Sequence, residues 1–137
     1  MLIIGHKLLK NLDFSFIESV EEVKDNKVYC IVYDEKLISY LSQNDFEFAI
    51  LVQNKDEIFL ANALGAKFLL CNDKKLAKFA SKVAEFYVFD SRVLMIVDKL
   101  ENFKKFYKLK IDGIILKDNI DNVGGKIKFP FGKIKLP

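Results

Sequence analysis

The sequence predicts an α/β fold, an open three-layer Rossmann-like parallel sheet of five to six strands. Short apolar runs recur along the chain, helix patterns lie between them, and the connections are short. Several runs are apolar at consecutive positions, which is typical of strands covered on both faces. Because strand and helix alternate, the strands should be parallel. The expected strands are residues 2–5, 28–34, 48–53, 68–71, 93–98 and 113–116.

Helix start signals follow several of these runs. Asn54 and Glu57 have the spacing of a capping box, and Gly65 is placed to end that helix. Asp34 and Asp73 can each cap a following helix. Their inner faces would be Leu37, Ile38 and Leu41 for the first, and Leu76, Phe79, Ala80 and Val83 for the second.

Two further helices are expected on weaker grounds. Asp98 and Glu101 repeat the capping-box spacing, with Leu100, Phe103 and Tyr107 as the inner stripe. Residues 14–23 also have a helical pattern, with Phe14, Ile17 and Val20 on the inner face.

The chain of 137 residues fits one domain, which we place at residues 1–120. Residues 121–137 are interpreted as a basic C-terminal arm or hairpin, because Lys alternates with apolar residues around a Pro-Phe-Gly turn. The apolar runs are too short to span a bilayer or to form a signal peptide. We therefore expect a cytoplasmic protein.

The charge pattern argues against nucleic-acid binding. The net charge is +3, but residues 1–116 hold 17 basic and 17 acidic side chains, and Arg92 is the only arginine in the chain. The two cysteines, Cys30 and Cys71, lie far apart in apolar patterns, and a single histidine offers no metal-ligand cluster. We expect buried, reduced thiols and no metal site.

Polar residues stand where the predicted strands end. In open α/β sheets ligands bind beyond the carboxyl ends of the strands, and a small anionic ligand is conceivable there, although no cofactor can be named. The candidate ligand-binding residues are Gly5, His6, Lys7, Asp34, Asn54 and Asp73.

Two nucleotide- or phosphate-linked interpretations fit poorly. Residues 5–10, Gly-His-Lys-Leu-Leu-Lys, lack the second and third glycines of a G-x-G-x-x-G loop, so side chains would obstruct a pyrophosphate. A phosphoacceptor receiver domain would need carboxylates after the first strand and an aspartate where Gln53-Asn54 stands.

Residues 46–84, "FEFAILVQNKDEIFLANALGAKFLLCNDKKLAKFASKVA", run strand, polar turn, helix, "LGA", strand, polar turn, helix. This stretch resembles the RCK-type nucleotide-binding domains that regulate potassium transport. The resemblance implies the α/β fold and nucleotide binding. The family's glycine-rich loop has no counterpart in residues 5–10.

Helix capping explains Asp34, Asn54, Asp73 and Asp98 together without a catalytic role, whereas an enzyme would need His6 or these acids to converge. We therefore expect a non-catalytic ligand-sensing or protein-interaction module, with a degenerate nucleotide- or phosphate-binding domain as the alternative. Self-association as a homodimer would use the C-terminal arm or the aromatic run Phe86, Tyr87 and Phe89. Equally, these rings could close the bottom of the core.

Overall fold

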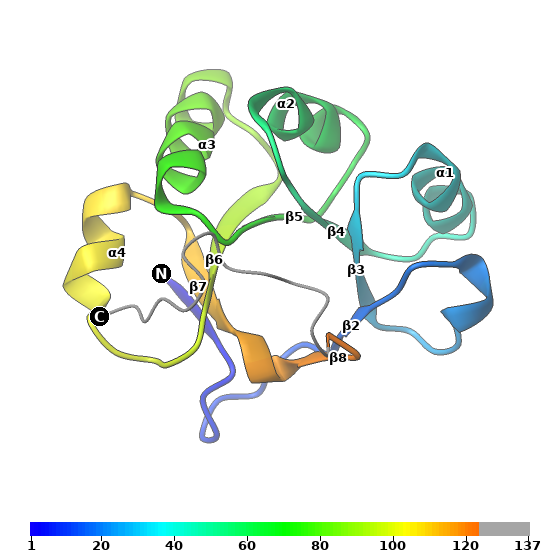
Figure 1. Ribbon diagram of the computed structural model, residues 1–137, viewed down its shortest axis with the longest axis horizontal. Coiled ribbons are helices and arrows are strands. Elements are labelled where there is room, and N and C mark those ends of the chain that lie inside the picture. The colour runs from blue at the N-terminus through cyan, green and yellow to red at the C-terminus, as the bar shows by residue number, and fades with distance from the viewer. Residues whose placement is uncertain (124–137) are drawn as a thin grey trace.

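A computed structural model describes residues 1–123, which form a single sheet with helices packed against it (Figure 1). The strands are β1 (Leu2–Ile4), β2 (Phe14–Phe16), β3 (Val28–Val32), β4 (Phe48–Leu51), β5 (Phe68–Cys71), β6 (Arg92–Val97), β7 (Gly113–Leu116) and β8 (Ile120–Asp121). The α-helices are α1 (Glu35–Gln43), α2 (Lys55–Ala63), α3 (Lys74–Tyr87) and α4 (Phe103–Leu109). The short 3₁₀ helices are η1 (Val20–Glu22) and η2 (Lys117–Asn119). The predicted arm or hairpin over residues 121–137 lies, beyond Val123, outside the described residues.

The predicted α/β class and parallel sheet are confirmed, and the predicted strand count is wrong. The eight strands have the order β1-β7-β6-β5-β4-β3-β2-β8, and every pairing is parallel. The six expected strands correspond to β1 and β3 to β7. Strand β2 was missed because its residues fit the helix predicted over 14–23, and β8 was missed because it has only two residues.

Residues 14–23 do not form the predicted helix. Phe14 and Phe16 lie on the same face of strand β2, which pairs with β3, and only η1 is helical in this stretch. The apolar spacing fits a helix, but the two phenylalanines also repeat with the period of two that a strand requires. Burial of both rings against neighbouring strands determines the outcome.

The sheet is strongly curled, and chain connectivity requires it. Strand β7 is second in the order and β8 is last, yet only η2 separates them in sequence. In a flat sheet six strand spacings would put them about 29 Å apart. The four residue steps from Leu116 to Ile120 span at most about 14 Å. The two ends of the sheet must therefore approach each other, as Figure 1 shows.

The helices cover one face of the sheet. The buried apolar side chains of α1, α2, α3 and α4 all belong to the cluster formed by the outer face of the strands. The opposite face forms a second cluster whose buried members all come from strands, apart from Val123 just after β8. Within it Phe14 packs against Phe68 at 5.6 Å between ring centroids. The expected third layer of helices is absent from the part of the chain described, because the curled sheet packs against itself.

Helix α4 begins later than predicted. Its N-cap is Asn102 in the left-handed conformation, so the expected capping box of Asp98 and Glu101 is wrong. The buried residue of this helix is Phe106, whereas Phe103 and Tyr107 are exposed. The face of α4 that packs against the sheet is therefore the one that carries Phe106, not the predicted stripe.

Candidate functional site

The carboxyl ends of the parallel strands gather along one rim, and the polar residues there cap helices. The Asp34 carboxylate accepts hydrogen bonds from the amides of Lys36 (2.9 Å) and Leu37 (3.1 Å). Asp73 accepts from the Lys75 amide at 3.2 Å. Both predicted caps are confirmed, and both side chains act within their own helix turn.

The predicted N-cap Asn54 at the start of α2 is also confirmed, while Glu57 reaches the amide before the cap instead of the cap's own amide. Asn54 Oδ1 accepts from the Glu57 amide at 3.0 Å, and Glu57 Oε1 accepts from the Gln53 amide at 2.8 Å. The two side chains also lie within hydrogen-bonding distance of each other, at 3.4 Å. The local need of the helix for N-terminal acceptors therefore accounts for this part of the rim.

The turn after β1 uses its own polar groups. The Gly5 amide donates to Asn11 Oδ1 at 2.8 Å, and Asn11 Nδ2 donates to the His6 carbonyl at 3.3 Å. His6 Nδ1 accepts from the Leu8 amide at 3.0 Å. Lys7 is exposed. A phosphate loop directs such amides at its ligand, so this turn would have to reopen before Gly5 could donate to one.

The thiols are buried, as predicted. Cys30 lies on the inner face of β3, and Cys71 lies on the outer face of β5. Burial raises the pKa of both thiols, that of Cys71 to about 12. Nearby Asp73 raises the pKa of Cys71 further. Neither sulfur is a thiolate near neutral pH, so neither is poised as a nucleophile or a metal ligand.

Residues 1–123 contain no cluster of three or more His, Cys, Asp or Glu side chains suited to a metal ion. The same stretch has no helix long and apolar enough to cross a bilayer.

A cleft of about 520 Å³ lies on the outer face where η1 stands in place of a full helix. Its walls carry charges of both signs. Tyr29 fixes one wall, because its hydroxyl accepts from the Lys24 amide at 3.0 Å and donates to the Asp25 carbonyl at 2.5 Å. The lining residues are Ser15, Glu21, Glu22, Lys24, Lys27, Tyr29 and Asn122.

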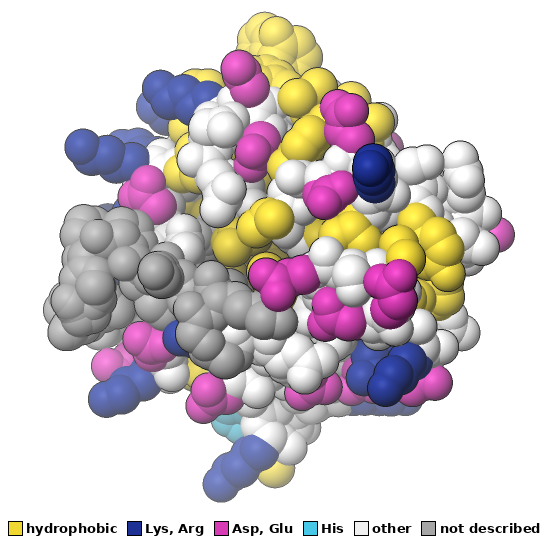
Figure 2. Space-filling model, turned by 45° about the vertical axis from the view of Figure 1, so that its right-hand side comes forward, with side chains coloured by type: hydrophobic (Ala, Val, Ile, Leu, Met, Phe, Trp, Pro, Cys, Tyr) yellow, Lys and Arg dark blue, Asp and Glu magenta, His cyan; other side chains and the backbone are white. Residues whose placement is uncertain are grey.

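Apolar side chains are exposed on α2 and at the end of α3, and we name this set the aromatic surface. Helix α2 contributes Phe59, Leu60 and Leu64, the last from its C-terminal end. Helix α3 contributes the half-buried Phe79 and the exposed Phe86, Tyr87 and Val88. In Figure 2 hydrophobic side chains gather at the top of the molecule, where Figure 1 places these helix ends.

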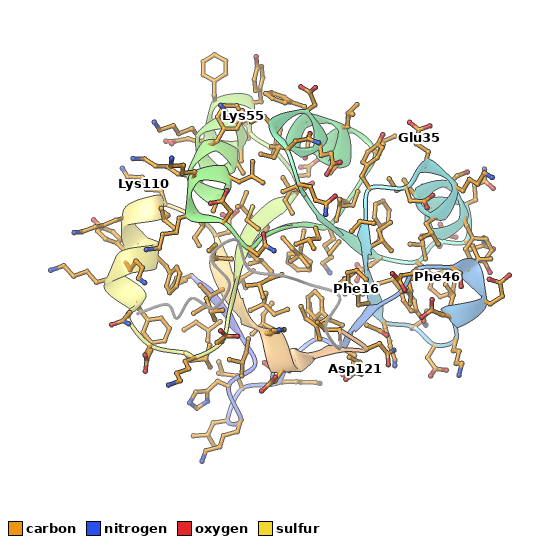
Figure 3. All side chains as sticks on the ribbon, in the orientation of Figure 1. Phe16, Glu35, Phe46, Lys55, Lys110 and Asp121 are labelled. Atoms are coloured by element: carbon orange, nitrogen blue, oxygen red, sulfur yellow. The ribbon has the colours of Figure 1, made fainter. Side chains whose placement is uncertain are left out.

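Edge-to-face ring contacts hold the aromatic surface together. The ring centroid of Phe59 lies 6.3 Å from those of both Phe79 and Tyr87, and the centroids of Phe86 and Tyr87 are 4.8 Å apart. Lys55 lies over the Phe79 ring at 4.7 Å from its centroid (Figure 3). Phe86 is nevertheless 78% exposed and Tyr87 62%. Phe79 packs against the core, whereas Phe86 and Tyr87 contact other rings of the aromatic surface and remain mostly exposed.

Val88 is held in an unusual backbone conformation at the edge of this surface. It ends α3 with φ 53° and ψ 60°, in the left-handed region, and its side chain is 82% exposed. A β-branched residue there is a true outlier, since glycine or asparagine normally takes this place.

The sequence pattern anticipates part of the aromatic surface. Phe86 and Tyr87 are exposed as a subunit contact would require, whereas Phe89 packs against the core. The contribution of α2 was missed. The run from Ile58 to Leu64 is apolar around most of the helix, and that pattern leaves some apolar side chains without a place in the core.

Comparisons with known proteins give no match: no protein-family model, no curated protein and no solved structure is similar to this chain.

Proposed function

We propose that this protein is a non-catalytic interaction domain that pairs with a second copy of itself through the aromatic surface. The observation that carries the proposal is the exposure of three consecutive apolar residues, Phe86, Tyr87 and Val88, beside the apolar outer side of α2. Aromatic side chains concentrate at the centres of protein interfaces, where their burial contributes most to binding.

The size of the surface supports a protein partner. Taking about 150–250 Å² for a whole aromatic side chain, the exposed parts of the aromatic surface amount to roughly 600 Å². The largest apolar patch on a typical soluble monomer is about 300–600 Å² and is often functional, so the aromatic surface lies at the top of that range. A stable interface buries about 800 Å² on each partner, so the aromatic surface would supply most of one side.

A second copy suits the surface because identical partners most often pair about a twofold axis, with the same patch on both sides. The edge-to-face arrangement of Phe59, Phe86 and Tyr87 leaves ring faces and edges that can interdigitate with their own copies. The net charge of +3 on 137 residues adds little repulsion between copies.

The rim supports the non-catalytic part of the proposal. His6 Nδ1 accepts from the Leu8 amide within its own turn. The other candidate acids or bases, Asp34 and Asp73, accept amide hydrogen bonds from their own helices. Helix capping is sufficient reason for both residues to be there.

The test is the molar mass of the full chain, measured by sedimentation equilibrium over a range of concentrations. The wild type should dimerise, and Phe86→Ser should shift the dimer dissociation constant upward by about tenfold or more. Tyr107→Ser, which removes an equally exposed ring from α4, is the matched control and should leave the dimer unchanged. A wild-type monomer at all concentrations would refute self-association.

A further inference from the structure

The lysines of the folded body are concentrated on two neighbouring helices, and we name this region the lysine face. Helix α3 contributes Lys74, Lys75, Lys78 and Lys82. Helix α4 and its C-cap contribute Lys104, Lys105, Lys108 and Lys110. The two helices contain a single acid, Glu85. A body that is neutral along its sequence is therefore strongly polarised in space.

Lysines of α3 and α4 meet at the contact between the two helices. Lys74, Lys78 and Lys82 are spaced by four residues, so they form one stripe. Lys74 is in direct contact with Lys105 of α4. The Ser81 hydroxyl donates to the Leu109 carbonyl at 2.7 Å, which fixes the two helices against each other. Figure 3 shows amino groups projecting on this side of the molecule, where Lys110 is labelled.

The close approach of the Lys74 and Lys105 amino groups concentrates positive charge where an anion would be stabilised. The pKa of Lys105 is lowered by partial burial, then by the charge of Lys74 and the hydrogen bond with it. Each of these effects disfavours the protonated amine, and a bound phosphate would reverse the second. A row of such lysines attracts a polyanion more strongly than a single anion, because each phosphate bound releases counterions.

Two exposed aromatic rings belong to α4, the helix that also contributes to the lysine face. Phe103 is 40% exposed and Tyr107 is 76% exposed, and they stand one helical turn apart on α4. Each has a lysine as its next neighbour in sequence, Lys104 and Lys108. Proteins that bind single strands without sequence preference combine a basic track for the phosphates with rings on which bases stack.

We propose that the lysine face binds single-stranded nucleic acid without sequence specificity. Phosphates would lie along the lysines between α3 and α4, and bases would stack on Tyr107 and Phe103. The near absence of arginine had argued against nucleic acid at the level of sequence, yet arginine is needed chiefly for bidentate reading of bases. Lysine serves as a point charge for phosphates, so its dominance here fits binding to the backbone.

The test is fluorescence anisotropy of the full-length protein with a labelled oligothymidylate about 20 nucleotides long, titrated at several salt concentrations. The triple variant Lys74→Gln/Lys78→Gln/Lys82→Gln should bind at least tenfold more weakly. The slope of log affinity against log salt should fall by about 2, since each phosphate that the variant no longer neutralises removes about 0.7 from it. Tyr107→Ser should weaken binding about fivefold or more with no change in slope.

The matched control is Lys24→Gln/Lys27→Gln/Lys36→Gln, which removes the same charge outside the lysine face. Lysines 126, 128, 133 and 135 are present in every variant, so any binding that they contribute cancels. Thermal unfolding checks that each variant folds. Equal losses in both triple variants would overturn the proposal, as would no binding at low salt. Binding to vesicles of phosphatidylcholine and phosphatidylserine without any binding of the oligonucleotide would also overturn it.

Discussion

The Asn122 side chain donates a hydrogen bond from Nδ2 to the Ser15 hydroxyl oxygen at 3.1 Å, joining residues 107 positions apart. Ser15 is in β2 and Asn122 follows β8, so this contact reinforces the pairing that closes the curled sheet. Ser15 is only 3% exposed, so its hydroxyl depends on a protein partner.

The Asn122 contact gives a stability prediction. Asn122 has φ 64°, so Asn122→Ala loses the hydrogen bond and also places alanine in the left-handed region. We expect the free energy of unfolding to fall by about 2 kcal/mol in urea denaturation. Asn122→Gly loses the hydrogen bond without the backbone strain, so its free energy of unfolding should fall by only about 1 kcal/mol. Equal losses would mean that the side-chain hydrogen bond alone matters.

Gly113 is predicted to be indispensable for pairing β1 with β7. A Cβ at this position would lie 2.6 Å from the Leu2 Cβ and 2.9 Å from the Leu2 carbonyl carbon, and closer still to the Leu2 carbonyl oxygen. Gly113→Ala should therefore displace β1 and lower the free energy of unfolding by about 3 kcal/mol, measured in urea. Gly65→Ala is the control, because it has φ 93° but open space around it. The free energy of unfolding of Gly65→Ala should fall by only about 1 kcal/mol. A smaller loss for Gly113→Ala than for Gly65→Ala would contradict the prediction.

Each strand that could be predicted contains a run of three or more consecutive apolar residues. Such runs are recognisable locally, as in residues 48–51 and 68–71. The curl could not be predicted, because it follows from the pairing of β1 with β7 and of β8 with β2, across long stretches of sequence. Register between distant strands is set by tertiary packing, and no local pattern records it.

The caps at Asp34, Asn54 and Asp73 could be predicted, because an N-cap depends on a few adjacent residues. A count of charges along the chain does not reveal the lysine face, because basic and acidic residues are equal in number over residues 1–116. Lys74, Lys78 and Lys82 have a four-residue spacing that already places them on one side of a helix. What the sequence could not show is that α4 brings its own lysines to that side.

Val88 is predicted to lower the stability of the monomer and to strengthen the dimer. Val88→Gly removes a strained β-branched residue from the left-handed region, at a site where the side chain buries little area. The monomer should become more stable by up to about 1 kcal/mol in thermal unfolding at low concentration. Sedimentation equilibrium should at the same time show a weaker dimer, because the interface buries one apolar side chain fewer on each copy. A variant that is less stable and dimerises normally would show that Val88 serves the monomer instead.

The role of Asp34 as a cap makes a different prediction from a role in ligand binding. Asp34→Ala should lower the free energy of unfolding by about 1 kcal/mol, since two amides of α1 lose their acceptor. Asp34→Asn should recover most of that stability, because asparagine is an equally good cap. The urea midpoints of the two variants provide the measurement. An Asp34→Asn protein as unstable as Asp34→Ala would mean that the negative charge itself is required.

The buried thiols should make the protein less stable in alkaline solution. Burial, followed by the charge of Asp73, raises the pKa of Cys71 from 9.0 to about 12 in the folded state. Below about pH 9 both states hold the proton, so the thiol has no effect on stability. From about pH 9 to about pH 12 only the unfolded chain ionises, so stability falls by up to about 1.4 kcal/mol for each pH unit. Cys71→Ala loses some stability at every pH through its cavity, but its stability should fall less steeply above pH 9. Urea unfolding at pH 8, 9 and 10 compares the slopes, and parallel curves for wild type and variant would show that the thiol ionises equally in both states.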